Sequence, residues 1–219
     1  MSACEVRSEQ ENAESQAAMP KITAVTDIAS TRWIKLQTLD YKDQMGKMRK
    51  WDMATRTTKR LEASADAVVI LALLKTSTGV ANSIETLVVE QFRPPVRRTT
   101  VELPAGLIDV NETPEEAALR ELKEETGYTG QVAYVSPEVC MSPGICDETV
   151  RIVVVNVDLD EAANKHPKQQ LEEGEYCVVR RIPLPKLRQD IDKSKGVPIE
   201  GIYLLAQGVE LGASLSSNA

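Results

Sequence analysis

Acidic side chains recur at regular spacing in one stretch of this 219-residue chain, between Gly106 and Tyr128. The stretch reads GLIDVNETPEEAALRELKEETGY and fits the pattern G-x5-E-x7-R-E-U-x-E-E-x-G-U, in which U is a bulky apolar residue. Its end brings Glu121, Glu124 and Glu125 close together in the chain. Hard divalent cations such as Mg2+ prefer carboxylate oxygens, keep several waters and share phosphate groups. The pattern therefore predicts a metal site that acts on a phosphate-bearing substrate.

A helix has to position these carboxylates, and the local sequence predicts one from about Pro114 to Thr126. Thr113 is a suitable N-cap, and Glu116 completes a T-x-x-E capping box. Gly127 is expected to end the helix in the left-handed conformation. At about 100° per residue, the three glutamates span an arc of roughly 100° that borders the apolar face of the helix.

A solvated acidic helix face is the alternative interpretation of the same glutamates. Like charges three and four residues apart on a helix cost a few tenths of a kcal/mol each. Arg120 is expected to offset that repulsion by reaching Glu116 and Glu124. A loop led by glycine, residues 106–111, precedes the helix and lets the backbone approach a ligand. These two features favour the metal site over the solvated face.

Composition excludes several other classes of function. A net charge of −7 argues against sequence-independent nucleic-acid binding, which needs a basic surface. The single histidine, His166, lies in a polar stretch, so a Ser-His-Asp or Cys-His mechanism is not expected. No apolar run is long enough to span a membrane. The four cysteines (Cys4, Cys140, Cys146 and Cys177) form no C-x-x-C pair and are expected to be free thiols. We expect a cytoplasmic protein that also has access to the nucleus.

The remaining sequence predicts an α+β fold in which helices pack outside a mixed sheet. Strands are expected at residues 31–40, 47–56, 67–74, 84–91, 131–135, 150–157 and 176–181, and two further helices at 184–193 and 198–210. A two-stranded hairpin is marginal alone, so the N-terminal strands must pack on their own core or on a second subunit. We expect a disordered tail at 1–20, an N-terminal β unit at 21–62 and a main domain at 63–219.

The pattern at 106–128 resembles the signature box of the Nudix hydrolases at every fixed position. QFRPP at 91–95, ELPAGLID at 102–109 and Pro143 resemble the ADP-ribose pyrophosphatase branch of that family. The resemblance implies an α/β/α sandwich with a small N-terminal antiparallel sheet, exchanged between the subunits of a homodimer. It also implies hydrolysis of ADP-ribose and related ADP-sugars to AMP and a sugar phosphate, with Mg2+ as cofactor and Mn2+ able to replace it.

The resemblance also assigns substrate-binding positions. Trp33 and Trp51 match two tryptophans that sandwich adenine, one from each subunit, and stacking contributes about 1–3 kcal/mol per base. Asp52 matches an acidic residue near the adenine. Simple packing of the tryptophans is the alternative. Arg56 and Arg93 match diphosphate-binding positions, with a role in surface solubility as the alternative. Leu107 is also counted with the substrate-binding positions.

Metal and catalytic positions follow from the same resemblance. The metal ligands are the backbone of Ala105 and the side chains of Glu121, Glu124 and Glu125, and Glu121 and Glu125 are also counted as catalytic. Glu112 matches a position that binds a further metal or braces the loop. In LEEGEY, Glu175 matches a residue proposed as a general base, with a charged turn as its alternative; Asp147 and Glu148 are weaker candidates for the same role.

Two rival functions remain at this point. A hydrolase of oxidised guanine nucleoside diphosphates would use the same box, and an aromatic clamp accepts different bases. A Nudix sensor that binds a nucleotide without cutting it is the second rival. The presence of Glu121, Glu124 and Glu125 argues against the sensor, because binders that have lost catalysis usually lose these carboxylates.

Overall fold

A computed structural model describes residues 19–60, 62–76 and 84–216. Most of the expected tail, residues 1–18, and Cys4 lie outside this range. The chain divides into two compact units. The first comprises the residues up to Lys59 together with Met141–Glu148, and the second comprises Arg60–Cys140 together with the chain from Thr149 onward.

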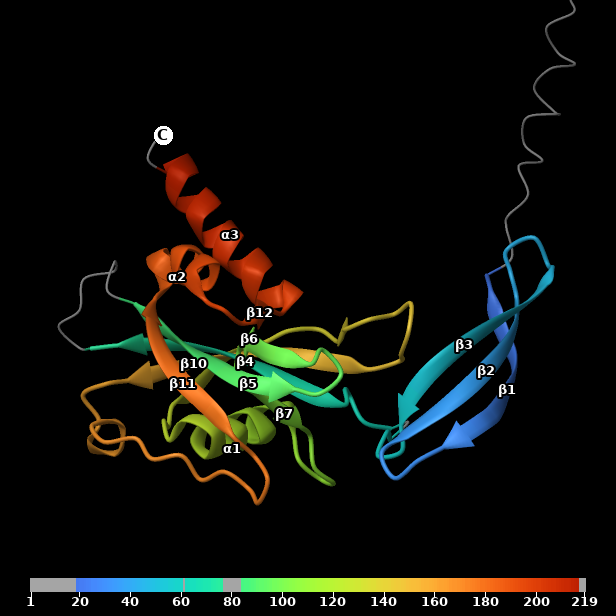
Figure 1. Ribbon diagram of the computed structural model, residues 1–219, viewed down its shortest axis with the longest axis horizontal. Helices are drawn as coiled ribbons and strands as arrows, with labels where there is room; N and C mark the ends of the chain where they lie inside the picture. The colour runs from blue at the N-terminus through green and yellow to red at the C-terminus, as the bar shows by residue number, and fades with distance from the viewer. Residues whose placement is uncertain (1–18, 61, 77–83, 217–219) are drawn as a thin grey trace, which may run out of the picture. The chain divides into compact units, whose positions relative to one another are not determined.

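The first unit is built on a three-stranded antiparallel sheet, β1 (Lys21–Ser30), β2 (Ile34–Lys42) and β3 (Met48–Arg56), in the order β1-β2-β3 (Figure 1). Two of these strands were predicted, whereas β1 was not recognised as a separate strand. Bulges in its pairing with β2 break the alternation by which a strand is recognised. The segment Met141–Glu148 joins the sheet through a hydrogen bond of 2.8 Å from Ala54 N to Ile145 O.

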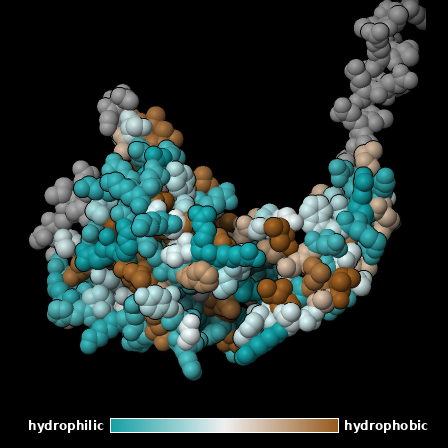
Figure 2. Space-filling model, viewed as in Figure 1, coloured by the Kyte–Doolittle hydropathy of each residue, from teal (hydrophilic) through white to brown (hydrophobic). Residues whose placement is uncertain are grey.

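This sheet has almost no core of its own. Thr55 is the buried residue within its three strands, and large apolar side chains are exposed on it. Ile22, Val25, Ile28, Leu36 and Trp51 are all more than 40% exposed, and Figure 2 shows brown apolar residues on its surface. Exposed apolar area of this extent is typical of a surface that binds another protein chain.

The second unit contains a mixed nine-stranded sheet with the path β12-β6-β5-β4-β10-β8. Strand β11 also pairs with β5, β7 with β4, and β9 with β10. The strands are β4 (Ala67–Lys75), β5 (Glu85–Arg93), β6 (Arg98–Glu102), β7 (Ala105–Leu107), β8 (Gln131–Val135), β9 (Val139–Cys140), β10 (Thr149–Asp158), β11 (Cys177–Pro183) and β12 (Val197–Pro198). The central pair, β4 and β10, is parallel. Strand β4 carries a continuous apolar run from Ala67 to Leu74, whereas β10 alternates buried residues with exposed or half-buried ones.

Helices cover both faces of this sheet, which gives the expected α/β/α sandwich (Figure 1). On one face, α1 (Pro114–Thr126) packs Ala117, Ala118 and Leu122 against buried residues of β4 and β10. On the other face, α2 (Leu187–Lys193) and α3 (Glu200–Ser216) pack on β5, β6 and β11. Short 3-10 turns, η2 (Ala162–Asn164) and η3 (Leu184–Lys186), complete the unit. None of the helices within the described ranges is long and apolar enough to cross a membrane.

The helix that carries the acidic residues begins and ends as predicted. Thr113 accepts a hydrogen bond from Glu116 N, the Glu116 carboxylate accepts one from Thr113 N, and Pro114 is the first helical residue. Gly127 caps the C-terminus with a φ of 77°. Local capping signals thus fix the helix register, and the register fixes which side chains face the site.

Candidate active site

Arg120 lies at the centre of the acidic cluster on α1. Its Nε donates to Glu112 Oε1 at 2.8 Å, and its Nη1 donates to Glu121 Oε1 at 2.7 Å and Glu124 Oε2 at 3.1 Å. Its Nη2 donates to the carbonyl of Leu107 at 2.9 Å. The predicted contact with Glu124 is confirmed, whereas the predicted contact with Glu116 is wrong, because the capping box uses that carboxylate. Arg120 thereby ties the helix to the loop before it.

Glu112 braces the loop between β7 and α1. It binds the Arg120 guanidinium and also accepts a hydrogen bond from Asp109 N at 2.9 Å. The guanidinium holds the pKa of Glu112 below its usual range, and the surrounding carboxylates raise the pKa of Arg120. The geometry therefore matches the bracing alternative for Glu112. Leu107, counted with the substrate positions, is 38% exposed and meets Arg120 through its carbonyl.

Glu121 lies directly against the backbone of β7. A Cβ built on Gly106 would stand 1.9 Å from Cδ of Glu121, so any other residue here would push the Glu121 side chain out of its position. Burial raises the pKa of Glu121, although Arg120 works in the opposite direction. The glycine that opens the sequence pattern is thus required for steric reasons, to let a charged side chain approach the loop.

Glu125 is the most strongly perturbed carboxyl of the cluster. Its Oε2 accepts a hydrogen bond from Ala105 N at 3.0 Å. Burial raises its pKa to about 8, and the negative charges of Glu121 and Glu175 add to the shift. A buried carboxylate among like charges is unfavourable unless a cation lies nearby.

The donor set fits a divalent cation. Backbone and carboxylate oxygens are the ligands that Mg2+ and Mn2+ prefer, and two of these carboxyls have raised pKa values. Within the described part of the chain, no three acidic, histidine or cysteine side chains already converge in metal-binding geometry. The observed hydrogen bonds explain part of this arrangement, since Arg120 holds Glu121 and Glu124 while Ala105 holds Glu125.

Glu175 lies in an exposed acidic loop that precedes β11. Its backbone N donates to Glu172 O at 3.1 Å, and its carboxylate accepts from Glu172 N at 3.0 Å. Its charge contributes to the raised pKa values of Glu121 and Glu125. The loop carboxylate therefore acts electrostatically on the helix carboxylates. Next to the loop, burial raises the pKa of the Cys177 thiol to about 11, which keeps it protonated.

Arg93 binds a buried carboxylate that the sequence analysis did not single out. Its Nε and Nη2 donate to the two oxygens of Glu102 at 2.8 and 2.7 Å. Glu102 is 2% exposed, and it also accepts hydrogen bonds from Thr100 and Gln91. Glu102 immediately precedes the LPAGLID run, so its position beside the motif was the available signal. A forked ion pair at this place fixes the Arg93 guanidinium at the end of β5.

Arg60 is a second residue that the sequence analysis missed. Its Nη2 donates to the carbonyls of Ile108 at 2.9 Å and Asp109 at 2.8 Å. It therefore holds the same loop that Arg120 and Glu112 brace. The contact spans 48 residues of sequence, and no local pattern around Arg60 indicates it.

The remaining predicted site residues lie in the first unit. Trp33 is 58% exposed beneath the Arg32 guanidinium, which stands 4.4 Å from its ring centroid, and Trp51 is 47% exposed on β3. Asp52 accepts a hydrogen bond of 2.6 Å from the Thr38 hydroxyl. Arg56 Nε donates to Glu148 at 2.6 Å, and Asp147 accepts a bond of 3.0 Å from the Thr55 hydroxyl. In this arrangement Asp147 and Glu148 brace β3.

The two tryptophans lie far apart within the first unit, with Trp33 in the connection between β1 and β2 and Trp51 on β3. Thr57 N donates to Trp33 O at 3.0 Å, so Trp33 lies beside a residue six positions after Trp51. Six residues of strand correspond to roughly 20 Å. Rings on the two faces of one base lie about 7–8 Å apart, twice a carbon contact distance. The backbone separation of the two tryptophans is thus more than twice the distance between two rings that sandwich one base.

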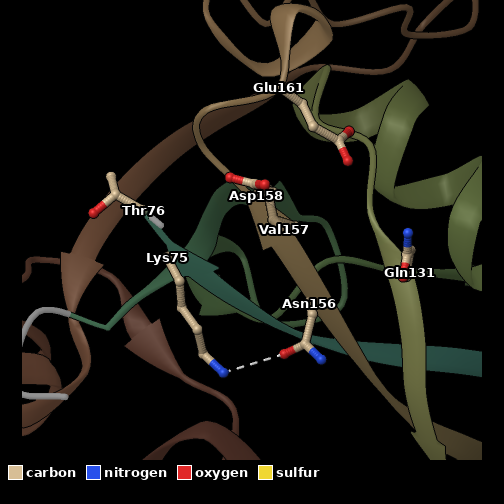
Figure 3. A pocket seen from close by; sticks show the side chains of 7 residues that line it. All are labelled: Lys75, Thr76, Gln131, Asn156, Val157, Asp158 and Glu161. Atoms are coloured by element: carbon tan, nitrogen blue, oxygen red, sulfur yellow. Dashed lines mark hydrogen bonds between the residues drawn. The ribbon is translucent and has the colours of Figure 1, made fainter. Parts of the chain in front are cut away.

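Two cavities of the second unit are lined by residues other than the carboxylate cluster. One, of about 280 Å³, opens where β4 and β10 end, and Lys75 Nζ donates to Asn156 Oδ1 at 3.4 Å across it (Figure 3). The other, of about 520 Å³, lies between the C-terminus of α1 and β11 and includes Tyr128, Gln169 and Tyr176. Neither cavity is lined by a predicted site residue, so shape alone would not have located the acidic cluster.

The sequence matches the NUDIX domain over residues 64–198, and the chain belongs to the Nudix family. Members of this family typically use a divalent metal. Similar proteins include the ADP-ribose pyrophosphatase of Saccharomyces cerevisiae, 40% identical over 195 residues, which cover 89% of this chain and 79% of the yeast protein. The ADP-sugar pyrophosphatase of Mus musculus is 39% identical over 182 residues, covering 83% of this chain and 82% of the mouse protein.

A solved structure supports the fold. The crystal structure of an ADP compounds hydrolase superposes with a TM-score of 0.59 and covers 90% of this chain and 96% of its own. The sequence identity is 18%, so this likeness bears on the fold alone. The Nudix fold expected from the box is thereby confirmed.

Proposed function

We propose that the protein hydrolyses the diphosphate bond of ADP-ribose and related ADP-sugars, releasing AMP and a sugar phosphate. The observation that carries the proposal is the placement of Glu121 and Glu125 against Ala105 and Gly106, within a complete Nudix box. The names of the yeast and mouse relatives support ADP-sugars over oxidised guanine nucleotides as the substrate class.

Mg2+ is the proposed cofactor, with Mn2+ able to replace it. Its ligands would be the carbonyl of Ala105 and the carboxylates of Glu121, Glu124 and Glu125. When bound, a divalent cation neutralises charge on the diphosphate and makes water more acidic. The raised pKa values of Glu121 and Glu125 support this assignment, because a nearby cation would favour their ionised forms.

The protein's own residues orient the reaction. Arg120 and Glu112 hold the end of β7 and the loop that follows it in place, so the cluster is preorganised before substrate binds. Arg93 is fixed by Glu102, and a guanidinium has five N–H donors, so Arg93 can bind this carboxylate and a phosphate oxygen together. Arg56 is proposed to act in the same way from its pair with Glu148. Glu175 accepts the proton of the attacking water at a carboxylate oxygen.

Adenine recognition is proposed to need two copies of the chain. The separation of Trp33 and Trp51 within the first unit supports a clamp formed by Trp33 of one copy and Trp51 of the other. The nearly coreless β1-β2-β3 sheet supports the same arrangement, because it needs a partner surface. We therefore propose a homodimer in which the N-terminal sheet is exchanged, with Asp52 near the adenine.

Steady-state assays with a panel of ADP-sugars and oxidised guanine nucleotides, with Mg2+ and mass detection of products, test this function. We expect ADP-ribose or another ADP-sugar to be hydrolysed to AMP. Glu121→Gln should lower turnover by at least about 100-fold while the protein stays folded. Faster turnover of the oxidised guanine nucleotides would replace the proposed substrate, and unchanged turnover of Glu121→Gln would refute the site.

A further inference from the structure

The segment Lys168–Gln170, here called the strap, lies against the C-terminal turn of α1. Gln170 N donates to Glu124 O at 2.7 Å. A Cβ on Gly127 would stand 2.2 Å from Lys168 N, so the last glycine of the box is needed for the strap to approach. The strap therefore occupies the end of the helix that carries Glu121, Glu124 and Glu125.

One side chain of the strap joins the helix to the sheet. Gln169 Nε2 donates to Glu125 O at 2.7 Å and to Cys177 O at 3.1 Å. An amide NH2 has two donors, so both bonds can form at once. Cys177 is the first residue of β11, where it pairs with Gln91 of β5, and it is 7% exposed. The Gln169 amide thus links the C-terminal end of α1 to the buried start of β11.

The acidic loop comprises residues 171–176, and the residues on both sides of it are held near the Gln169 amide. The residue before the loop is Gln170, whose backbone N–H donates to Glu124 O. The residue after it is Cys177, whose carbonyl accepts a hydrogen bond from Gln169. Fixing both ends of a short loop restricts the conformations open to it. Glu175 is in this loop, and its charge reaches Glu121 and Glu125.

We propose that Gln169 is a positioning residue, which sets the place of Glu175 relative to the carboxylates of α1 by joining Glu125 O to Cys177 O. This inference rests on the proposed function, because it assigns Gln169 a role in that reaction. Gln169 itself touches no reacting atom. It acts through the loop whose ends it ties together.

Two variants of Gln169 test the proposal in the full-length protein. Gln169→Met keeps the length of the side chain without its donors, and Gln169→Glu keeps its shape while replacing the donors with acceptors. Gln170→Met is the matched control, because Gln170 contacts Glu124 through its backbone N–H, which the substitution keeps. For both Gln169 variants we expect kcat for ADP-ribose to fall roughly 5- to 50-fold, the effect of losing two hydrogen bonds, while KM stays within about two-fold. Amide hydrogen exchange in residues 171–177 should become faster.

A double-mutant cycle with Glu175→Gln separates positioning from general stability. If Gln169 acts through Glu175, then Gln169→Met should lower kcat of the Glu175→Gln enzyme less than about two-fold. Independent, multiplicative losses in the double variant would overturn the proposal, and so would full turnover of Glu175→Gln. The same two lost hydrogen bonds should lower the melting temperature of Gln169→Met by a few degrees, and by the same amount in the Glu175→Gln protein.

The outcomes distinguish this proposal from the proposed function. Absence of ADP-sugar hydrolysis by the wild-type protein would refute the function and, with it, this role of Gln169. A wild-type enzyme that hydrolyses ADP-ribose, with Gln169→Met equal to it in kcat and in hydrogen exchange, would refute the positioning role and leave the function standing.

Discussion

The Glu121 carboxylate occupies the space that a side chain on Gly106 would need. A Cβ at residue 106 would stand 1.9 Å from both Cδ and Oε1 of Glu121. Gly106 lies in β7, which pairs with β4, so the backbone cannot easily move away. Gly106→Ala should therefore displace Glu121 and lower turnover by roughly 100-fold, because misplacement of a reacting group by about 1 Å has effects of this size. Steady-state kinetics, with circular dichroism to confirm folding, would check it.

Gly208→Ala is the matched control for that substitution. A Cβ at residue 208, within α3, meets nothing within 4 Å. Alanine is the better helix former by about 1 kcal/mol, so this variant should be slightly more stable and fully active. Equal activity of the two alanine variants would contradict the steric role of Gly106.

Arg93 is expected to be as important for folding as for substrate binding. Its guanidinium is the forked partner of Glu102, which is 2% exposed. Arg93→Ala would leave a buried carboxylate without that partner and should lower the free energy of unfolding by roughly 2–4 kcal/mol. Adding Glu102→Gln should restore most of the stability but not the KM for ADP-ribose. Urea denaturation of the three proteins measures this, and full stability of Arg93→Ala alone would exclude the structural role.

Mixing two tryptophan variants tests the shared adenine clamp. Trp33→Ala and Trp51→Ala should each raise KM for ADP-ribose strongly, since stacking contributes about 1–3 kcal/mol per base. A heterodimer of the two variants would contain one site with both tryptophans and one site with neither. After unfolding and refolding together in equal amounts, activity should recover to roughly one quarter of wild type, because half of randomly formed dimers are mixed and half of their sites are intact. Mixtures no more active than the separate variants would argue for a clamp within one copy.

The pKa of Glu125 predicts an unusual pH dependence of stability. In protein freed of cations with a chelator, burial raises this pKa from 4.5 to about 8. The folded state then holds a proton that the unfolded state releases. The contribution of Glu125 to the free energy of unfolding is therefore fully present below about pH 4.5 and is lost as the pH rises towards 8. The loss should be on the order of a few kcal/mol, and Glu125→Gln should remove it. Chemical denaturation of both proteins between these pH values checks the slope, and parallel curves would contradict the assignment.

Local signals predicted α1 well, and tertiary contacts decided the features that were missed. The capping box at Thr113 and the glycine at 127 are read from neighbouring residues, so both helix ends were predicted correctly. The prediction of the partners of Arg120 was partly wrong, because Glu112 folds back from the loop to bind Arg120 while Glu116 caps the helix. The ion pair of Arg93 with Glu102 and the contacts of Arg60 depend on how strands and loops meet in space. No periodicity in the sequence reports such contacts.

The first unit is assembled from distant parts of the chain, and this has a consequence for its synthesis. Thr55 and Arg56 bind Asp147 and Glu148, 92 residues further on. Strands β1 to β3 leave the ribosome early, yet the segment that completes them is translated only after the acidic helix and most of the large sheet. Because contacts between distant residues form late, the portion of the protein made first stays incomplete until Met141–Glu148 has been translated, and its apolar strands remain exposed during that interval.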